Sequence, residues 1–213
     1  EAGVEMLRRG GNAIDAAVAT SFTLSVTDPF SCGIGGGGFM LVSYPGPHQN
    51  RINVAIDYRE RCPEKIDATF FVDDASRSSH TGGTAVAVPG SVAGLWAAHQ
   101  RWGCLPWSTC LQPAIKAATE GVPVNGPWLA AMESVRARRQ ANVFAESSSR
   151  WIWEHLCGEG KLSVGDMIRQ PSQAALLSLL ADRGPSAFYS GIVASDLIEA
   201  VQSTGGVMTK NDL

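Results

Sequence analysis

The densest group of charged side chains in the sequence is the stretch DYRERCPEK, residues 57–65. Within it, Arg59 has the chemistry to bind an organic acid, because a guanidinium stays charged and its planar fork can donate two parallel hydrogen bonds to one carboxylate. The stretch directly follows a predicted β-strand. Residues at a strand end are held by the sheet and yet open to a cleft, so Arg59 is the candidate substrate-binding residue.

A simpler interpretation of the same stretch needs no ligand. Arg59 and Glu60 can be solvated or can pair with neighbours such as Asp57, and surface ion pairs of this kind contribute little stability. The residue pattern alone favours this second interpretation. The two interpretations are distinguished by whether Arg59 faces a cavity.

Four consecutive glycines, Gly35 to Gly38, suggest a phosphate-binding loop, and together with Gly33 they fit the pattern G-x-G-x-x-G. A dinucleotide loop follows a strand and precedes a helix. Here the order is reversed, since a buried helix is predicted upstream and a strand, FMLVSY, downstream. We therefore reject a nucleotide site. Glycines also allow positive φ and a close passage of the backbone against another layer of structure, which is the interpretation we prefer.

The elements that must position Arg59 follow from the residue pattern. Asn12 is a predicted N-cap with Asp15 in the first turn, and the apolar helix that it starts should end near Pro29. Phe39–Tyr44 and Ile52–Asp57 flank the turn-forming sequence PGPHQN. This arrangement predicts a β-hairpin whose second strand leads directly into the charged stretch.

The rest of the chain is predicted to be mainly helical. Thr84–Val88 is predicted to be a short buried strand, and Ser91 is expected to cap a helix that ends at Gly103. The next predicted helix, PWSTCLQPAIKAATEG, contains Pro113 and should be kinked or split there. Residues 140–165 show no clear period and are predicted to be a variable surface excursion. Further helices are expected around residues 128–139, 173–182 and 192–203, so a helix, a hairpin and a helical lobe together indicate an α+β fold.

The composition argues against several kinds of partner. The 213 residues carry a formal net charge of −3, and 45% of them are hydrophobic, which is enough for a sizeable core. Weak acidity without a run of Lys or Arg makes nucleic acid an unsuitable partner. The five cysteines form no C-x-x-C, and the four histidines have no paired-ligand spacing with them. Neither a metal site nor another cofactor is therefore predicted.

Both ends of the sequence suggest a piece of a longer protein. It opens with an amphipathic helix in which Val4 and Leu7 recur at helical spacing, without a capping residue before it. Near the other end, Thr209 followed by Asp212 is typical of a capping box that starts a helix. Too few residues follow to complete a stable helix, so we expect a fragment.

Several segments, in one order, resemble a known family. In chain order, these segments are LRRGGNAIDAAVAT, SCGIGGGGFMLV, DYRERCPEK, GGTAVAVPGSVAGLWAAHQRWGCLPW, QPAIKAATEGVPVN, GPSAFYSG and GGVMTKNDL. Together they resemble the large subunit of gamma-glutamyltransferase, also called glutathione hydrolase. The resemblance covers almost all of residues 1–213 and is weakest over residues 140–165. Residues 1–213 are accordingly expected to be part of one large-subunit domain.

The resemblance implies an N-terminal-nucleophile hydrolase with an αββα sandwich, of which this chain is the large-subunit part. In that family the precursor cleaves itself, and the new N-terminal threonine of the small subunit attacks a γ-glutamyl amide. The acyl-enzyme then passes to water or to an acceptor amino acid or peptide. The arginine of the family pattern R-E-x-x-P binds the α-carboxylate of the glutamyl group, a role that passes to Arg59. Glu60 and Pro63 match as well, whereas Cys62 replaces the usual alanine.

The sequence lacks the family's nucleophile, which follows well beyond Leu213. Thr81 does not have its sequence context, and neither G-x-S-x-G nor a thiol-hydrolase signature is present. No catalytic residue is therefore assigned, and the chain alone is predicted not to hydrolyse glutathione. The implied partners are glutathione or other γ-glutamyl compounds, together with the rest of the large subunit and the small subunit. The family suggests an extracellular, membrane-anchored, vacuolar or periplasmic location.

Two alternatives stay open at this point. Besides part of a gamma-glutamyltransferase, the chain can be a non-catalytic, truncated relative that acts as a binding or scaffold piece. It can also be a member of the same family similar to cephalosporin acylases, which accept a glutaryl side chain. A processing-site threonine encoded beyond Leu213 would favour an enzyme over the truncated relative.

Overall fold

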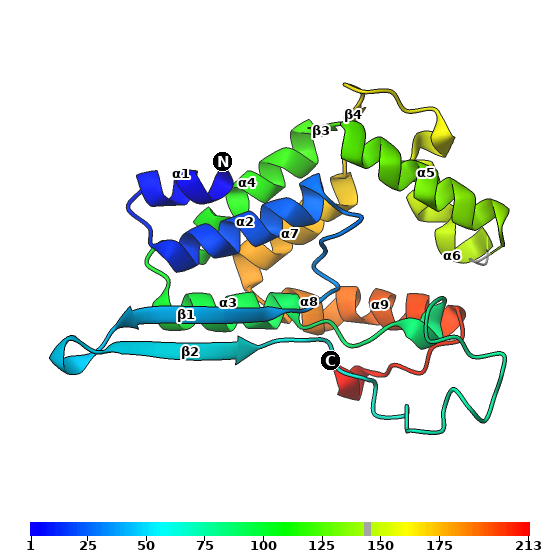
Figure 1. The fold of residues 1–213 in the computed structure, drawn as a ribbon, viewed down its shortest axis with the longest axis horizontal. Coiled ribbons are helices and arrows are strands. Elements are labelled where there is room, and N and C mark those ends of the chain that lie inside the picture. Colours follow the sequence, from blue (N-terminus) through cyan, green and yellow to red (C-terminus); the bar gives the residue numbers. More distant parts are fainter. Residues whose placement is uncertain (143–145) are drawn as a thin grey trace.

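Helices dominate the computed structural model, which describes residues 1–142 and 146–213, and two long strands form a hairpin. The predicted α+β class is confirmed (Figure 1). Among the described residues, no helix is long and apolar enough to cross a bilayer. The helices and strands are α1 (Ala2–Arg8), α2 (Ala13–Thr27), β1 (Phe39–Pro45), β2 (Arg51–Asp57), α3 (Ser91–Trp102), α4 (Trp107–Glu120), β3 (Val122–Pro123), α5 (Gly126–Gln140), α6 (Glu146–Trp151), β4 (Met167–Ile168), α7 (Pro171–Arg183), α8 (Ser186–Tyr189) and α9 (Gly191–Ser203).

Helix α2 begins and ends where the sequence predicts. The Asn12 side chain accepts hydrogen bonds from the backbone N–H groups of Ile14 and Asp15, and the Asp15 carboxylate accepts one from the N–H of Asn12. This reciprocal capping box satisfies N–H groups that have no partner within the helix. The helix ends at Thr27, two residues before Pro29.

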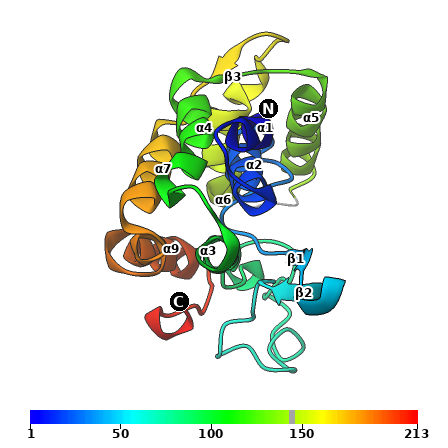
Figure 2. The same cartoon turned by 90° about the vertical axis from the view of Figure 1, so that its left-hand side faces the viewer.

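The main core lies between α2, α3, α4 and α7. Trp107 at the start of α4 is central to it, because its ring packs edge-on against Phe22 at 5.4 Å and against Trp96 at 4.9 Å between ring centroids. Its indole N–H donates to the carbonyl oxygen of Leu180 on α7 at 2.8 Å. Figure 2 shows α3 lying between the α2, α4 and α7 helices on one side and the hairpin on the other.

The hairpin confirms the two predicted strands to within one residue. Strands β1 and β2 pair in antiparallel register from Phe39 opposite Asp57 to Pro45 opposite Arg51. Hydrogen bonds between the backbones of Gly38 and Tyr58, at 3.0 and 3.3 Å, extend the ladder past the strands. One face of the hairpin is partly buried through residues such as Val42, whereas Phe39 and Leu41 on the other face are 66% and 86% exposed.

The predicted strand Thr84–Val88 is not formed. Residues Gly83–Ala85 form a short 3₁₀ turn, and only Val88 pairs with another backbone, that of Arg61, in an isolated antiparallel bridge. The apolar side chains of this segment pack instead on α9 and the last residues of the described chain, in a small cluster of Val88, Val201 and Met208. Burial of the valines therefore comes from helix packing rather than from a sheet.

Two other predictions about helices are corrected. In α1 the buried residue is Met6, whereas Val4 and Leu7 are about half exposed. Gly3 and Met6 are three residues apart, as Val4 and Leu7 are, and therefore lie on one face of α1. A Cβ at Gly3 would lie 2.7 Å from the Thr20 hydroxyl, so this face of α1 packs closely on α2. Helix α4 contains Pro113 and is one helix, so it is not split there, and the alternative of a kink at Pro113 stays a prediction.

Residues 140–165 contain more structure than the sequence predicts, although residues 143–145 lie outside the described part. Helix α6 continues into a π-helical segment, Ile152–Leu156, and a 3₁₀ turn, Gly158–Gly160. Leu156 and Cys157 are buried, and the indole of Trp128 on α5 donates to the carbonyl oxygen of Leu156 at 2.8 Å. The segment is therefore anchored to α5, and its variability among relatives stays a prediction.

Candidate functional site

A cavity of about 530 Å³ opens where the chain leaves β2. Its wall is formed by the strand exit, residues 57–61, by the turn before α3, residues 88–90, and by Ala93 and Tyr189. Asp212 and Leu213 complete the wall, since the end of the described chain lies beside the segment that follows β2 (Figure 1). Segments that are distant in the sequence thus meet around the charged stretch.

Arg59 lies in the wall of this cavity with an exposed side chain. Its backbone N–H donates to Oδ1 of Asp57 at 3.0 Å, which fixes the turn out of the strand. The side-chain ion pair with Asp57 that the sequence allowed is not formed, and none of the described residues makes an ion pair or a hydrogen bond with the Arg59 guanidinium. The guanidinium is accordingly available to an anionic ligand.

Glu60 is half-buried and lies beside the glycine loop. A second, smaller cavity of about 270 Å³ is lined by Glu60 and Tyr58 together with the glycine loop and part of α2. A side chain built at Gly37 would meet the Glu60 carboxylate at 2.8 Å. The two adjacent residues of the charged stretch thus differ in environment, and Arg59 is the more accessible of the two.

The glycine loop is built for close approach. A Cβ at Gly37 would lie 2.5 Å from the carbonyl oxygen of Tyr58 and 2.7 Å from the backbone N of Glu60, distances at which a side chain cannot fit. Positive φ is not the reason for these glycines, because none of Gly33 and Gly35–Gly38 has one. The order helix, glycine loop, strand is as predicted.

The turn before α3 supports the strand exit from behind. The carbonyl oxygen of Gly36 accepts hydrogen bonds from the N–H groups of Gly90 and Ser91, both at 2.9 Å. The prediction that Ser91 is the N-cap of α3 is wrong. Helix α3 begins at Ser91 and Gly90 is the N-cap, and no side chain of these two residues caps the helix. The loop carbonyl takes over that function.

Tyr189 and Asp212 are site residues that the sequence analysis did not find. The Tyr189 hydroxyl donates to the carbonyl oxygen of Pro89 at 2.9 Å and accepts from the N–H of Ala93 at 3.2 Å. Asp212 accepts from the N–H of Glu64 at 2.8 Å, and so ties the charged stretch to the end of the described chain. The capping box of Thr209 and Asp212 is confirmed, but its long-range contact left no signal in the spacing.

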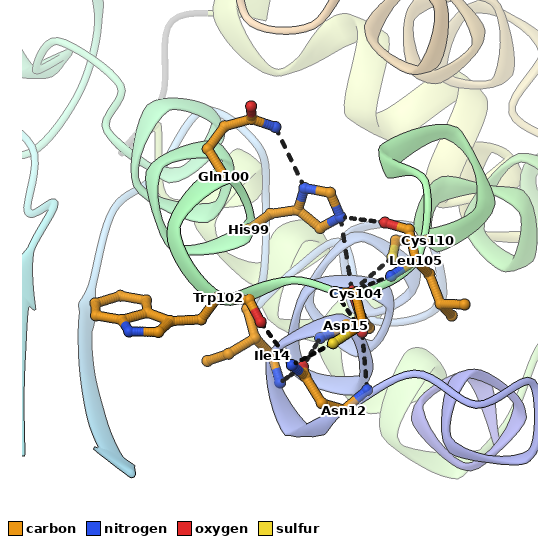
Figure 3. Close-up of polar contacts among 9 residues, drawn as sticks. All are labelled: Asn12, Ile14, Asp15, His99, Gln100, Trp102, Cys104, Leu105 and Cys110. Atoms are coloured by element: carbon orange, nitrogen blue, oxygen red, sulfur yellow. Dashed lines mark hydrogen bonds and ion pairs between the residues drawn. The ribbon is translucent and has the colours of Figure 1, made fainter. Parts of the chain in front are cut away.

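A buried polar cluster lies away from the cavity, between α2 and the start of α4 (Figure 3). The Asp15 carboxylate, which has no solvent exposure, accepts from the N–H groups of Cys104 at 3.1 Å and Leu105 at 3.2 Å. Nε2 of His99 lies 3.6 Å from Asp15 Oδ1 and 2.9 Å from the carbonyl oxygen of Leu105. Because a carbonyl oxygen only accepts, this ring nitrogen carries the proton.

Asp15, His99 and Cys110 bring three possible metal ligands within 4.8 Å of one another. Their donors are already committed to one another and to the backbone, and burial followed by the neighbouring Asp15 charge raises the pKa of the Cys110 thiol to about 12. A metal would need a thiolate and an unprotonated ring nitrogen at the same place. The cluster therefore fits a structural link between α2 and α4, and sequence spacing gave no sign of it.

Comparison with known proteins gives one consistent result. A family model described as Gamma-glutamyltranspeptidase matches residues 1–213. The chain is 37% identical over 218 residues to the glutathione hydrolase proenzyme of Escherichia coli strain K12, an alignment that covers 100% of this chain and 36% of that protein. The chain thus spans about one third of the length of this curated relative.

Solved structures agree with that match. The gamma-glutamyltranspeptidase of Helicobacter pylori superposes with a TM-score of 0.84 at 33% identity, over 99% of this chain and 59% of that chain. A cephalosporin acylase from Bacillus halodurans superposes with a TM-score of 0.83 at 30% identity, over 99% of this chain and 39% of the other. The fold is therefore that of the N-terminal-nucleophile hydrolases of this group, as the resemblance implied.

Proposed function

Because the chain belongs to the gamma-glutamyltranspeptidase family, we propose that it supplies the substrate-binding part of a gamma-glutamyltransferase, or glutathione hydrolase, that cleaves γ-glutamyl amides. In this proposal the acyl-enzyme forms on an N-terminal threonine outside residues 1–213, and Arg59 binds the α-carboxylate of the glutamyl group. The observation that carries the proposal is the position of Arg59 in the wall of an open cavity, without an ionic partner among the described residues.

The chemistry of the site supports this role. A carboxylate held by both arms of one guanidinium is fixed in orientation as well as in position. Such fixing places the amide carbon at the other end of the glutamyl group in a defined direction, where a nucleophile can be aligned with it. Arg59 stands on a rigid base for this purpose, since its backbone follows a hydrogen-bonded hairpin and is supported by the turn before α3.

The described thiols that the structure buries are poor nucleophiles. Burial raises the pKa of Cys110 to about 12 and that of Cys157 to about 11, so both are protonated near neutral pH. The Thr81 hydroxyl donates to that of Ser78 at 3.2 Å, and no described His, Asp or Glu side chain is hydrogen-bonded to it. We therefore infer that residues 1–213 alone do not hydrolyse glutathione, and release of glutamate by them would contradict this.

The hairpin offers a surface for the remainder of such an enzyme. Phe39 and Leu41 project from its outer face at 66% and 86% exposure, and its two strands pair only with each other among the described residues. A two-stranded sheet is marginally stable by itself and leaves unpaired edges. In the proposal, chain outside residues 1–213 covers this face and brings the nucleophile to the cavity.

Substitution of Arg59 in the complete protein tests the proposal. Hydrogen bonds to a charged group contribute about 1.5–3 kcal/mol, so Arg59→Ala is expected to lower kcat/KM for a γ-glutamyl anilide by roughly 10- to 100-fold, mainly through KM. Arg59→Lys should lower kcat/KM by most of the same amount, because an ammonium keeps the charge but not the planar fork. Steady-state kinetics with both variants measures the two contributions.

Arg51→Ala is the matched control. Arg51 is an exposed arginine at the far end of the same hairpin, where its guanidinium donates to the hydroxyl of Ser43 at 2.9 Å and to its carbonyl at 3.0 Å. Its loss should leave KM within about twofold of the unsubstituted protein, in line with the small effect of surface contacts. An unchanged KM in Arg59→Ala would remove Arg59 from the account.

A second candidate function, hydrolysis of a glutaryl amide, is favoured by the likeness to the cephalosporin acylase. A glutaryl group differs from a γ-glutamyl group by the absence of the α-amino group, and both present a carboxylate that Arg59 could bind. Kinetics with the glutaryl and γ-glutamyl forms of one anilide separates the candidates. A larger kcat/KM for the glutaryl form would replace the first proposal by the second.

A further inference from the structure

The start of α3 lacks a side-chain cap of its own and is completed by a residue from α8. The first N–H groups of a helix have no partner within it. Here the N–H of Ala93 donates to the Tyr189 hydroxyl at 3.2 Å, and the same hydroxyl donates to the carbonyl oxygen of Pro89 at 2.9 Å. One oxygen thus joins both sides of the turn, and burial raises the pKa of Tyr189, so it remains a donor near neutral pH.

This turn is the support of the strand that carries Arg59. A Cβ at Gly90 would lie 2.0 Å from the carbonyl oxygen of Tyr58 and 3.3 Å from that of Arg59, so the two backbones are in direct contact. Val88 is hydrogen-bonded to Arg61 on the other side of Arg59, at 2.7 and 3.3 Å. A displacement of the turn is therefore a displacement of the backbone on both sides of Arg59.

From these contacts we propose that Tyr189 is a positioning residue for Arg59: its hydroxyl fixes the turn before α3 and thereby the orientation of the guanidinium in the cavity. The inference rests on the proposed function of Arg59. Tyr189 also lines the cavity itself. Because the hydroxyl acts through the backbone, it should affect the binding of the substrate α-carboxylate by Arg59. It should not affect the scissile amide at the other end of the glutamyl group.

The variant Tyr189→Phe in the complete protein tests this, because it keeps the ring in the cavity wall and removes both hydrogen bonds. KM for a γ-glutamyl anilide is expected to rise about 5- to 20-fold, the range for one or two lost neutral hydrogen bonds, with kcat changed less than about twofold. Tyr44→Phe is the matched control, since Tyr44 packs against Trp102 on the hairpin with ring centroids 5.9 Å apart and lies outside the cavity.

A double-mutant cycle with Arg59→Ala separates positioning from general stability. If Tyr189 acts through Arg59, Tyr189→Phe should leave KM unchanged in the Arg59→Ala background. An equal rise of KM in both backgrounds, a loss confined to kcat, no effect at all, or a variant that does not fold would each overturn the inference while Arg59→Ala still supports the proposed function. If Arg59→Ala itself leaves KM unchanged, the proposed function fails and the inference with it.

Discussion

The buried carboxylate of Asp15 is predicted to be a main source of stability in the helical core. Its oxygens accept from the backbone N–H groups of Asn12 at 2.8 Å, Cys104 at 3.1 Å and Leu105 at 3.2 Å. Asp15→Asn keeps the shape but turns an NH₂ group toward these donors. A hydrogen bond to a charged group contributes about 1.5–3 kcal/mol, and an unsatisfied buried donor costs about 1–3 kcal/mol. The free energy of unfolding should therefore fall by about 3–5 kcal/mol.

Urea unfolding of the complete protein, followed by tryptophan fluorescence, measures this loss. Trp107 is a suitable reporter because its ring centroid lies 5.2 Å from that of His99, which is beside Asp15. The control Asp196→Asn, at an exposed position on α9, should change stability by less than about 0.5 kcal/mol. A loss below about 1 kcal/mol for Asp15→Asn would refute the structural role of the cluster.

The remaining predictions concern the glycine loop and the thiols. Gly37→Ala should lower the free energy of unfolding by about 1–3 kcal/mol, because the new methyl group would meet backbone atoms of Tyr58 and Glu60. Gly35→Ala is the control, since a Cβ there meets nothing within 4 Å. Equal losses in the two variants would argue against a close approach at Gly37. In an alkylation assay near pH 8, about the pKa of a free thiol, mass spectrometry should find exposed Cys62 labelled and buried Cys110 unlabelled. Since the folded pKa of Cys110, about 12, lies above the ordinary 9.0, the stability gained from its protonated thiol is complete below pH 9.0 and is lost as the pH rises toward 12.

The capping box of α2 and the hairpin were predicted correctly, because the forces that form them act between neighbouring residues. The capping box of Asn12 and Asp15 joins residues three positions apart, and the hairpin is set by the turn between its strands. The predicted strand Thr84–Val88 was wrong for the opposite reason. Its alternating valines also suit a surface provided by Val201 and Met208, more than one hundred positions later, and nothing local distinguishes the two outcomes.

In the candidate site, too, local contacts could be predicted from the sequence and long-range contacts could not. Arg59 could be placed at a strand exit from the pattern around it, because the hairpin and the charged stretch are contiguous in the sequence. Tyr189 could not, since its hydroxyl meets Pro89 only when α8 packs beside the start of α3. Likewise the contact between Asp15 and His99 depends on the packing of α2 against α3 and the loop after it. Roles that arise from tertiary contacts need the structure.

The most direct test of the central claim is a crystal structure of the complete protein with L-glutamate bound. Both oxygens of the α-carboxylate are expected to accept hydrogen bonds from the Arg59 guanidinium, at about 2.7–2.9 Å. A glutamate whose α-carboxylate is bound by other residues, with the Arg59 side chain turned to solvent, would contradict that claim.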